Sequence, residues 1–200
     1  MEKIDFDSLC VRAYEYAVKH GWHEEKYPAY HYMMLIVTEI AEAVNADRKG
    51  KYANRTMFEN NFYRSITDPE GHWIYCYETF IKDTVEDELA DAAIRIFDYV
   101  GVKESHIDDS IFREEAYLEL SEDLKGHSFT EIMFCIILSF GRKETANVYS
   151  ILYYLFAISY HLGIDLLWHI EQKMKYNDKS LFRLVYQVTQ IKKSLCFSSF

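Results

Sequence analysis

Proline and glycine are scarce in this chain. Its 200 residues include only two prolines and seven glycines. A turn-rich β-sandwich or barrel needs many more of both, so the composition favours long helices. Half of the residues are apolar and 16% are aromatic, which is enough for one sizeable hydrophobic core. We therefore predict a single all-α domain over residues 1–200, with no internal repeat or linker.

Positive charge is also in short supply. The chain has 22 Lys and Arg residues against 32 Asp and Glu residues, which gives a formal net charge of −10. Such an acidic chain is not expected to bind nucleic acid or anionic membrane surfaces through charge. An anionic substrate would need a metal ion or a local group of Lys and Arg side chains.

The sequence shows no cysteine pair motif and no targeting pattern. None of the four cysteines has CxxC spacing, which predicts reduced thiols in a cytoplasmic protein. The first residues lack the charged-then-apolar pattern of a signal peptide. The most membrane-like stretch, residues 148–170, carries His161, Asp165 and His169. We predict a buried helix pair there and no membrane partner.

Apolar residues recur at helical spacing in several segments. The core helices of the predicted bundle are expected at about residues 29–48, 84–100, 144–162 and 164–177, and further helices at 5–20 and 129–140. We interpret residues 51–78 as a polar and aromatic excursion, partly helical at 54–63. Residues 103–127 are expected to form an acidic helix, at about 111–124, flanked by loops.

Two of the expected core helices each carry a pair of carboxylates three residues apart. Glu39 and Glu42 form the first pair, and Glu88 and Asp91 form the second. Residues at i and i+3 share a helix face. Both pairs adjoin apolar arcs, where a lone carboxylate is costly unless it is paired or bound to metal. We predict that the pairs face each other and hold Mg²⁺, or Mn²⁺ in its place, through carboxylate oxygens.

Some of the charged residues near these pairs are expected to play supporting parts in the metal site. Arg95 is expected to balance the charge of Asp91, while Glu86 and Asp87 are expected to face elsewhere. Another helix ends in a cationic segment that could meet the phosphate groups of a substrate, and Asn177 could donate to a phosphate or a base. The cations of this segment are Lys173, Lys175 and Lys179.

The two carboxylate pairs, together with three further segments and in their order along the chain, resemble the MazG-like all-α nucleoside triphosphate pyrophosphohydrolases. The family's ExxE and ExxD patterns correspond to Glu39, Glu42, Glu88 and Asp91. The other matching segments are Ala46-Asp47-Arg48-Lys49-Gly50-Lys51, Gly163-Ile164-Asp165 and Lys173-Met174-Lys175-Tyr176-Asn177.

This resemblance implies a four-helix-bundle core with additional helices, assembled as a homodimer or higher homo-oligomer. It also implies Mg²⁺-dependent cleavage of a (d)NTP between its α- and β-phosphates, giving the monophosphate and pyrophosphate. The four carboxylates would be metal ligands and catalytic groups, with one of them orienting the water. Lys175 and Asn177 would contact the substrate.

The chain departs from the family after Asn177, where an Arg-Pro typically follows. Asp178, Lys179 and Ser180 stand there instead, so Lys179 or Arg183 is the candidate replacement. This departure keeps an alternative open, namely a non-catalytic helical module that senses nucleotides or binds a partner. A carboxylate-bridged di-iron bundle is disfavoured because no Glu in the chain is followed three residues later by His.

Overall fold

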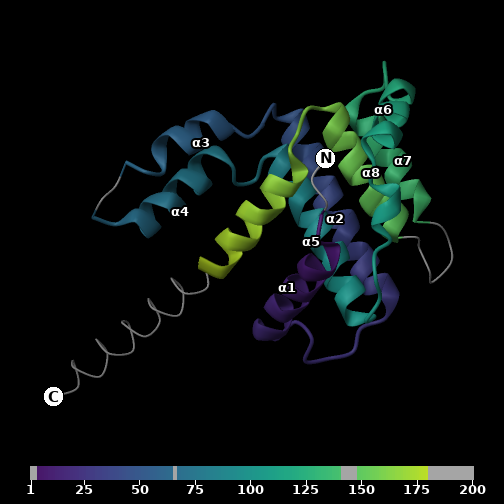
Figure 1. Cartoon of the computed structure of the whole chain (residues 1–200), viewed down its shortest axis with the longest axis horizontal. Coiled ribbons are helices and arrows are strands. Elements are labelled where there is room, and N and C mark those ends of the chain that lie inside the picture. Colours follow the sequence, from purple (N-terminus) through teal and green to yellow (C-terminus); the bar gives the residue numbers. More distant parts are fainter. Residues whose placement is uncertain (1–3, 65–66, 141–147, 180–200) are drawn as a thin grey trace.

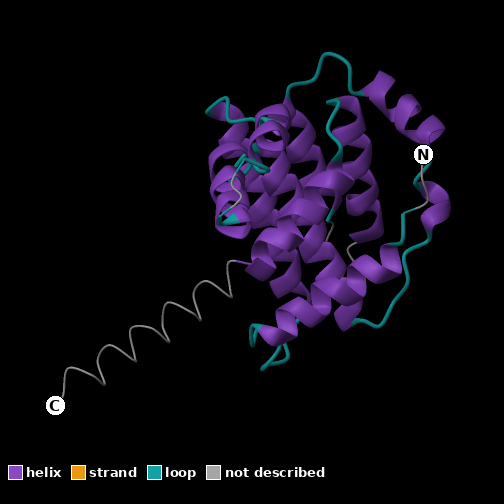
Figure 2. Cartoon of the chain, turned by 60° about the vertical axis from the view of Figure 1, so that its left-hand side comes forward, coloured by secondary structure: helices purple, strands orange, loops and turns teal. Residues whose placement is uncertain are grey.

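Helices make up all the regular secondary structure in the described part of the chain (Figure 2). The structure is a computed structural model, which describes residues 4–64, 67–140 and 148–179. The predicted all-α class is therefore confirmed for these residues. Eight α-helices are labelled in order along the chain: α1 (Phe6–Lys19), α2 (Ala29–Arg48), α3 (Arg55–Asn61), α4 (Pro69–Phe80), α5 (Val85–Val102), α6 (Glu114–Asp123), α7 (Phe129–Ser139) and α8 (Val148–His161).

A short 3₁₀ helix, Asp109–Ile111, precedes α6, and a further helix, Leu166–Lys179, follows α8. We refer to Leu166–Lys179 as the last described helix. Local signals in the sequence account for several helix boundaries. Gly21 and Gly50 follow α1 and α2 with φ angles of 75° and 63°, a left-handed conformation that ends a helix at little cost for glycine. Ser128 and Glu131 form a reciprocal capping box at the start of α7.

Helix α5 lies at the centre of the main hydrophobic core, and α1, α2 and α8 pack against it (Figure 1). Its apolar side chains Leu89 and Ile96 are fully buried, as are Ile36 and Ile40 of α2. The contact between α1 and α5 is close at Gly101. A Cβ atom at this glycine would lie 2.7 Å from the Cβ of Tyr14, so only glycine fits without a shift.

Helices α3 and α4 form an arm that projects from the bundle, with a smaller hydrophobic cluster of its own (Figure 1). Phe58 of α3 and Trp73 and Tyr77 of α4 are buried in this cluster. Trp168 and Tyr176 of the last described helix pack against it, and the Tyr176 ring stacks on Tyr77 with centroids 4.5 Å apart. The arm is therefore attached to the bundle through the helix that the sequence assigned to substrate binding.

The arm is more helical than the sequence indicated, since residues 51–78 contain the start of α4 as well as α3. The dipeptide Asp68-Pro69, which resembles a turn, begins α4 instead. The Asp68 side chain accepts a hydrogen bond from the Gly71 amide, and Pro69 occupies the first helical position. In the acidic segment, α6 spans Glu114–Asp123 and is therefore shorter than the helix predicted at about 111–124. Residues 144–147 of the third expected core helix lie outside the described residues.

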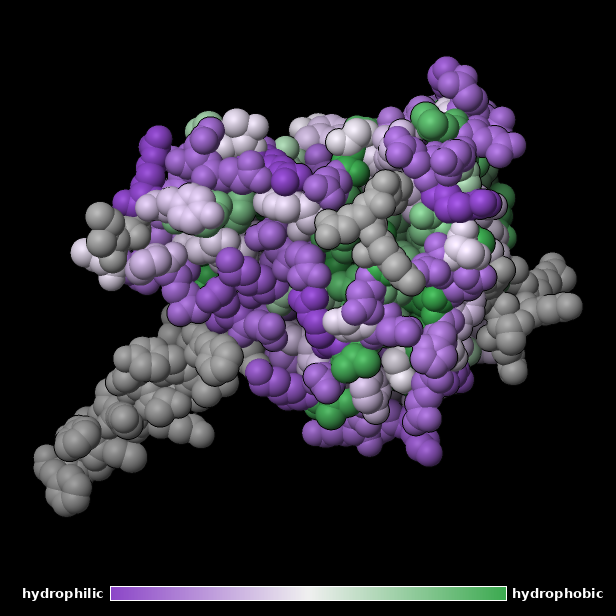
Figure 3. Space-filling model, in the orientation of Figure 1, coloured by the Kyte–Doolittle hydropathy of each residue, from purple (hydrophilic) through white to green (hydrophobic). Residues whose placement is uncertain are grey.

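Hydrophilic residues predominate over the arm on the face that Figure 3 shows. No single helix among the described residues combines the length and apolar character needed to cross a membrane. Helix α8 and the last described helix meet that test only when they are taken together, and they are bent by 112° at the break between them.

Candidate metal centre

The amino end of α5 concentrates carboxylates for a local electrostatic reason. Thr84 caps the helix by accepting a hydrogen bond of 3.3 Å from the Asp87 amide. Glu86, Asp87 and Glu88 follow in the first turn, where the helix dipole stabilises negative charge. All three side chains are buried, because α5 is covered on several sides at this end. This placement corrects the expectation that Glu86 and Asp87 face away from the bundle interior.

Three of the four predicted metal ligands converge between α2 and α5. Glu39, Glu42 and Glu88 each offer a carboxylate oxygen, and these oxygens lie within 4.8 Å of one another. Glu39 and Glu88 are 8% and 6% exposed, whereas Glu42 is exposed to solvent. The cluster therefore has a buried floor and an open side at Glu42, through which a cation and its remaining ligands could enter.

Glu88 is the unusual member of the cluster. Among the described residues no side chain or amide donates a hydrogen bond to its carboxylate, and the residue is only 6% exposed, so its oxygens depend on the little solvent that reaches them. Burial raises the pKa of Glu88 to about 8, against the attraction of Lys173, and the charges of Asp87, Asp91 and Glu42 raise it further. At neutral pH the carboxyl therefore holds a proton unless a cation replaces it.

The fourth predicted ligand, Asp91, is bound by a lysine of the last described helix. The Lys173 Nζ atom lies 2.6 Å from Asp91 Oδ2 and 2.9 Å from Asp87 Oδ2. Burial raises the pKa of Asp91 to about 7, against the attraction of Lys173. Burial alone would lower the pKa of Lys173, but the two aspartates outweigh it and raise that pKa above its usual range.

Arg95 pairs with a different carboxylate from the one expected. Its Nε atom donates to Glu39 Oε1 over 2.9 Å, and its guanidinium carbon lies 5.0 Å from the centre of the Trp22 ring. Arg95 therefore balances and orients Glu39, while Lys173 takes the role toward Asp91 that the sequence assigned to Arg95. The second oxygen of Glu39 has no donor among the described residues.

A second acidic group fits a metal ion less well. Asp83, Asp87 and Glu88 also have oxygens within 4.8 Å of one another. Both oxygens of Asp87 are already engaged, however, by the Tyr77 hydroxyl on Oδ1 and by the Asp83 amide and Lys173 on Oδ2. Asp87 therefore joins α4, α5 and the last described helix, and Glu39, Glu42 and Glu88 make the better metal-binding group.

The three residues predicted to bind substrate lie on two different sides of the last described helix. Lys175 Nζ lies 4.3 Å from the centre of the Trp73 ring, and Lys179 pairs with Glu70, so both lysines face α4. Asn177 lies toward α1, where its carbonyl oxygen accepts a hydrogen bond of 3.3 Å from the Tyr16 hydroxyl. Arg183, the other candidate, lies outside the described residues.

The sequence pattern assigned Lys173 to substrate phosphate and predicted that Asp87 faces away from the site, so it missed their contact. The spacing of Asp87 and Asp91 could have indicated it, because residues four apart share a helix face and one cation can neutralise both. Both acidic groups contain only carboxylates, so the described residues supply oxygen ligands and no histidine. This ligand set fits Mg²⁺ or Mn²⁺ better than Zn²⁺ or a di-iron centre.

We compared the chain with protein-family models, with curated proteins and with solved structures, and none of the three comparisons finds a match.

Proposed function

We propose that this protein is a Mg²⁺-dependent nucleoside triphosphate pyrophosphohydrolase of the MazG-like type. It would hydrolyse a (d)NTP between the α- and β-phosphates and release the monophosphate and pyrophosphate. Helices α2, α5, α8 and the last described helix would form the four-helix core of that family, in a homodimer or higher homo-oligomer.

The observation that carries the proposal is the environment of Glu88. This residue is 6% exposed, no donor among the described residues meets its carboxylate, and its companions in the metal-binding group are two more carboxylates, Glu39 and Glu42. Three ionised carboxylates in this arrangement would repel one another, so without a cation Glu88 keeps a proton, and a divalent cation would replace that proton and relieve the repulsion. Mg²⁺ commonly binds a few carboxylates and completes its shell with water and phosphate oxygens.

Each residue of the cluster then has a role in hydrolysis. Glu39, Glu42 and Glu88 would hold the metal ion, and Arg95 would fix the orientation of Glu39 through their 2.9 Å contact. A bound Mg²⁺ polarises a phosphoryl group and lowers the pKa of an attacking water. Asp91, with a pKa of about 7, is suited to accept the proton from that water as its oxygen attacks phosphorus and pyrophosphate leaves.

A second candidate function is the non-catalytic module, which is favoured by the position of Lys173. Its ammonium group already bridges Asp87 and Asp91, so it supplies part of the positive charge that a metal would bring. In addition, Lys175 and Lys179 contact α4. A chain that used these cations only to attach its arm would keep the fold without binding phosphate.

Pyrophosphate release from a panel of canonical and damaged (d)NTPs, with and without Mg²⁺, separates the two functions. We expect metal-dependent release from at least one nucleotide and its loss in Glu88→Gln and Glu39→Gln. Glu119→Gln, an exposed change on α6, is the matched control and should keep full activity. Metal binding without release from any nucleotide would favour the non-catalytic module.

A further inference from the structure

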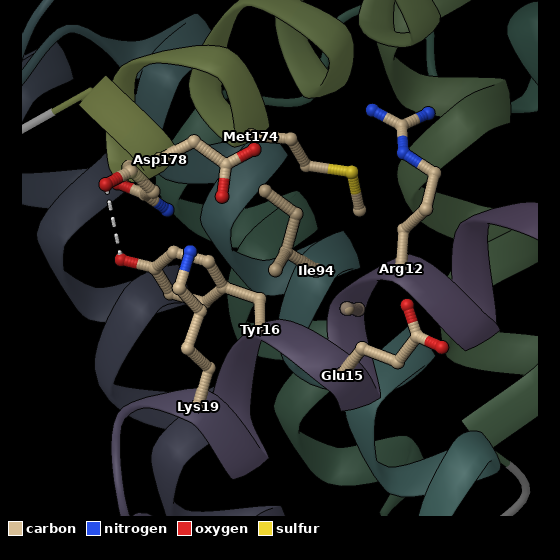
Figure 4. A pocket seen from close by; sticks show the side chains of 9 residues that line it. Arg12, Glu15, Tyr16, Lys19, Ile94, Met174 and Asp178 are labelled. Carbon is tan, nitrogen blue, oxygen red and sulfur yellow. Dashed lines mark hydrogen bonds between the residues drawn. The ribbon is translucent and has the colours of Figure 1, made fainter. Parts of the chain in front are cut away.

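A pocket of about 230 Å³ lies between α1 and the last described helix, over the middle of α5 (Figure 4). Complete small-molecule sites usually have volumes of roughly 300–1,000 Å³. The pocket is therefore large enough for part of a nucleotide but not for all of it. Ile94 and Met174 lie at its centre, and Ala13 and Tyr16 of α1 complete its apolar lining.

The pocket adjoins the candidate metal centre through two helices. Ile94 is three residues after Asp91 on α5, a spacing that places two side chains on neighbouring parts of one face. Met174 directly follows Lys173, the residue that binds Asp91. Burial raises the pKa of Tyr16 to about 12, and the charges of Asp178 in the pocket and Asp91 in the cluster both contribute. Tyr16, which lines the pocket, therefore lies within electrostatic range of Asp91.

The charges around the pocket indicate which part of a nucleotide it would take. Arg12 and Lys19 bring two positive charges, and Glu15 and Asp178 bring two negative charges, so the charged groups of the lining sum to zero. Arg12 is in addition already paired with Glu171 at 2.7 Å, so the pocket offers no excess of positive charge. A triphosphate would need a clear positive excess or a metal ion. A flat, neutral ring with polar edges suits an apolar floor that is surrounded by polar groups.

We propose that this pocket binds the nucleoside part of the substrate and leaves the phosphate chain to extend toward Glu39, Glu42 and Glu88. The inference rests on the proposed function and adds a location for the base and sugar. It separates two binding functions in space, with the ring held between α1 and the last described helix and the phosphates held by the metal.

Two variants alter the pocket without touching the carboxylates. Ile94→Phe fills its floor, and Lys19→Glu, an exposed change, makes its rim acidic. A change of this size in a pocket commonly alters discrimination by roughly 10- to 200-fold. We therefore expect KM for the nucleotide to rise about 10-fold or more while kcat stays within about twofold, the pattern of lost ground-state binding. Lys125→Glu, the same charge change just beyond the end of α6 and outside the pocket lining, should leave KM unchanged.

Equilibrium binding of two probes supplies an independent readout. A nucleoside monophosphate without metal should bind to Glu88→Gln and lose its affinity for Ile94→Phe and Lys19→Glu. Pyrophosphate with Mg²⁺ should show the reverse pattern. If the wild-type protein releases pyrophosphate while both pocket variants keep its KM and its monophosphate affinity, the pocket assignment is wrong and the proposed function stands. If no nucleotide is hydrolysed and no monophosphate binds, both are wrong.

Discussion

Replacement of Lys173 with Met removes the cation that lies between the two buried aspartates. The Lys173 side chain is 10% exposed, and its Nζ atom lies 2.6 Å from Asp91 and 2.9 Å from Asp87, which is fully buried. Removing one partner of a buried ion pair typically costs about 3–5 kcal/mol, because the other charge is left without compensation.

The structure places this substitution at the lower end of that range. Asp87 keeps its hydrogen bonds from the Tyr77 hydroxyl and the Asp83 amide. Asp91 is 19% exposed, and burial already raises its pKa against the attraction of Lys173, so without that lysine the carboxyl can take up a proton. We expect the free energy of unfolding to fall by about 3 kcal/mol. In a chain of this size that corresponds to a decrease of roughly 6–12 °C in Tm.

Urea unfolding followed by circular dichroism measures this loss. Lys175→Met is the matched control, because Lys175 is on the same helix but is exposed. Its ammonium group lies over the Trp73 ring, a cation–π contact worth about 0.5–1 kcal/mol. Mg²⁺ should restore part of the stability of Lys173→Met, by about 2.7 kcal/mol at 100 times its Kd, because Asp91 becomes available to the ion. A loss no larger than that of the control would refute this account of Lys173.

Three further predictions concern stability. Without metal, the free energy of unfolding should fall as pH rises from about 5 to about 8, by at most about 1.4 kcal/mol per pH unit for one group. The cause is that Glu88, with a folded pKa of about 8 against an ordinary 4.5, keeps a proton that the unfolded chain releases. Glu88→Gln should make this pH profile flatter in urea unfolding. Tyr77→Phe should cost about 1.5–3 kcal/mol in the same assay, because Asp87 loses a buried donor. Gly101→Ala should lower Tm measured by calorimetry, since its new Cβ would meet Tyr14 at 2.7 Å.

Each of these predictions has a clear contrary result. A pH profile that is the same in Glu88→Gln and in the wild-type protein would show that Glu88 does not hold the proton. Unchanged stability in Tyr77→Phe would show that Asp87 does not depend on that hydroxyl. An unchanged Tm in Gly101→Ala would show that α1 and α5 are less closely packed than the structure indicates.

Most of the helices, and the carboxylates that share one face of α2 or of α5, could be predicted from local sequence patterns. Helical periodicity located α2 and α5, and the i, i+3 spacing indicated which carboxylates share a face. Helix α4 was missed because Asp68-Pro69 has the composition of a turn, and whether it ends or begins a helix depends on what packs behind it. Trp73 and Tyr77 of α4 pack against Phe58 of α3, and a short stretch of sequence around Asp68-Pro69 does not show that contact.

The charge pairing within the site could not be predicted in the same way. A helical wheel assumes one buried face, and on that assumption Asp87 points away from the core. The first turn of α5 is instead covered by α4 and by the last described helix, which brings Lys173 to Asp87 and Asp91. The partner of Arg95 was also missed, because Glu39 lies 56 residues away in sequence and only tertiary packing brings the two together.

Direct binding of a divalent cation tests the central claim, that Glu39, Glu42 and Glu88 form a metal site. We expect saturable Mn²⁺ binding, measured by calorimetry, that Mg²⁺ competes away and that Glu88→Gln weakens by about 10-fold or more. Because the cation must displace the proton held at a pKa of about 8, affinity should be roughly 20-fold higher at about pH 8.5 than at about pH 6.5. Equal Mn²⁺ affinity in the wild-type protein and Glu88→Gln, or no binding at either pH, would contradict the claim.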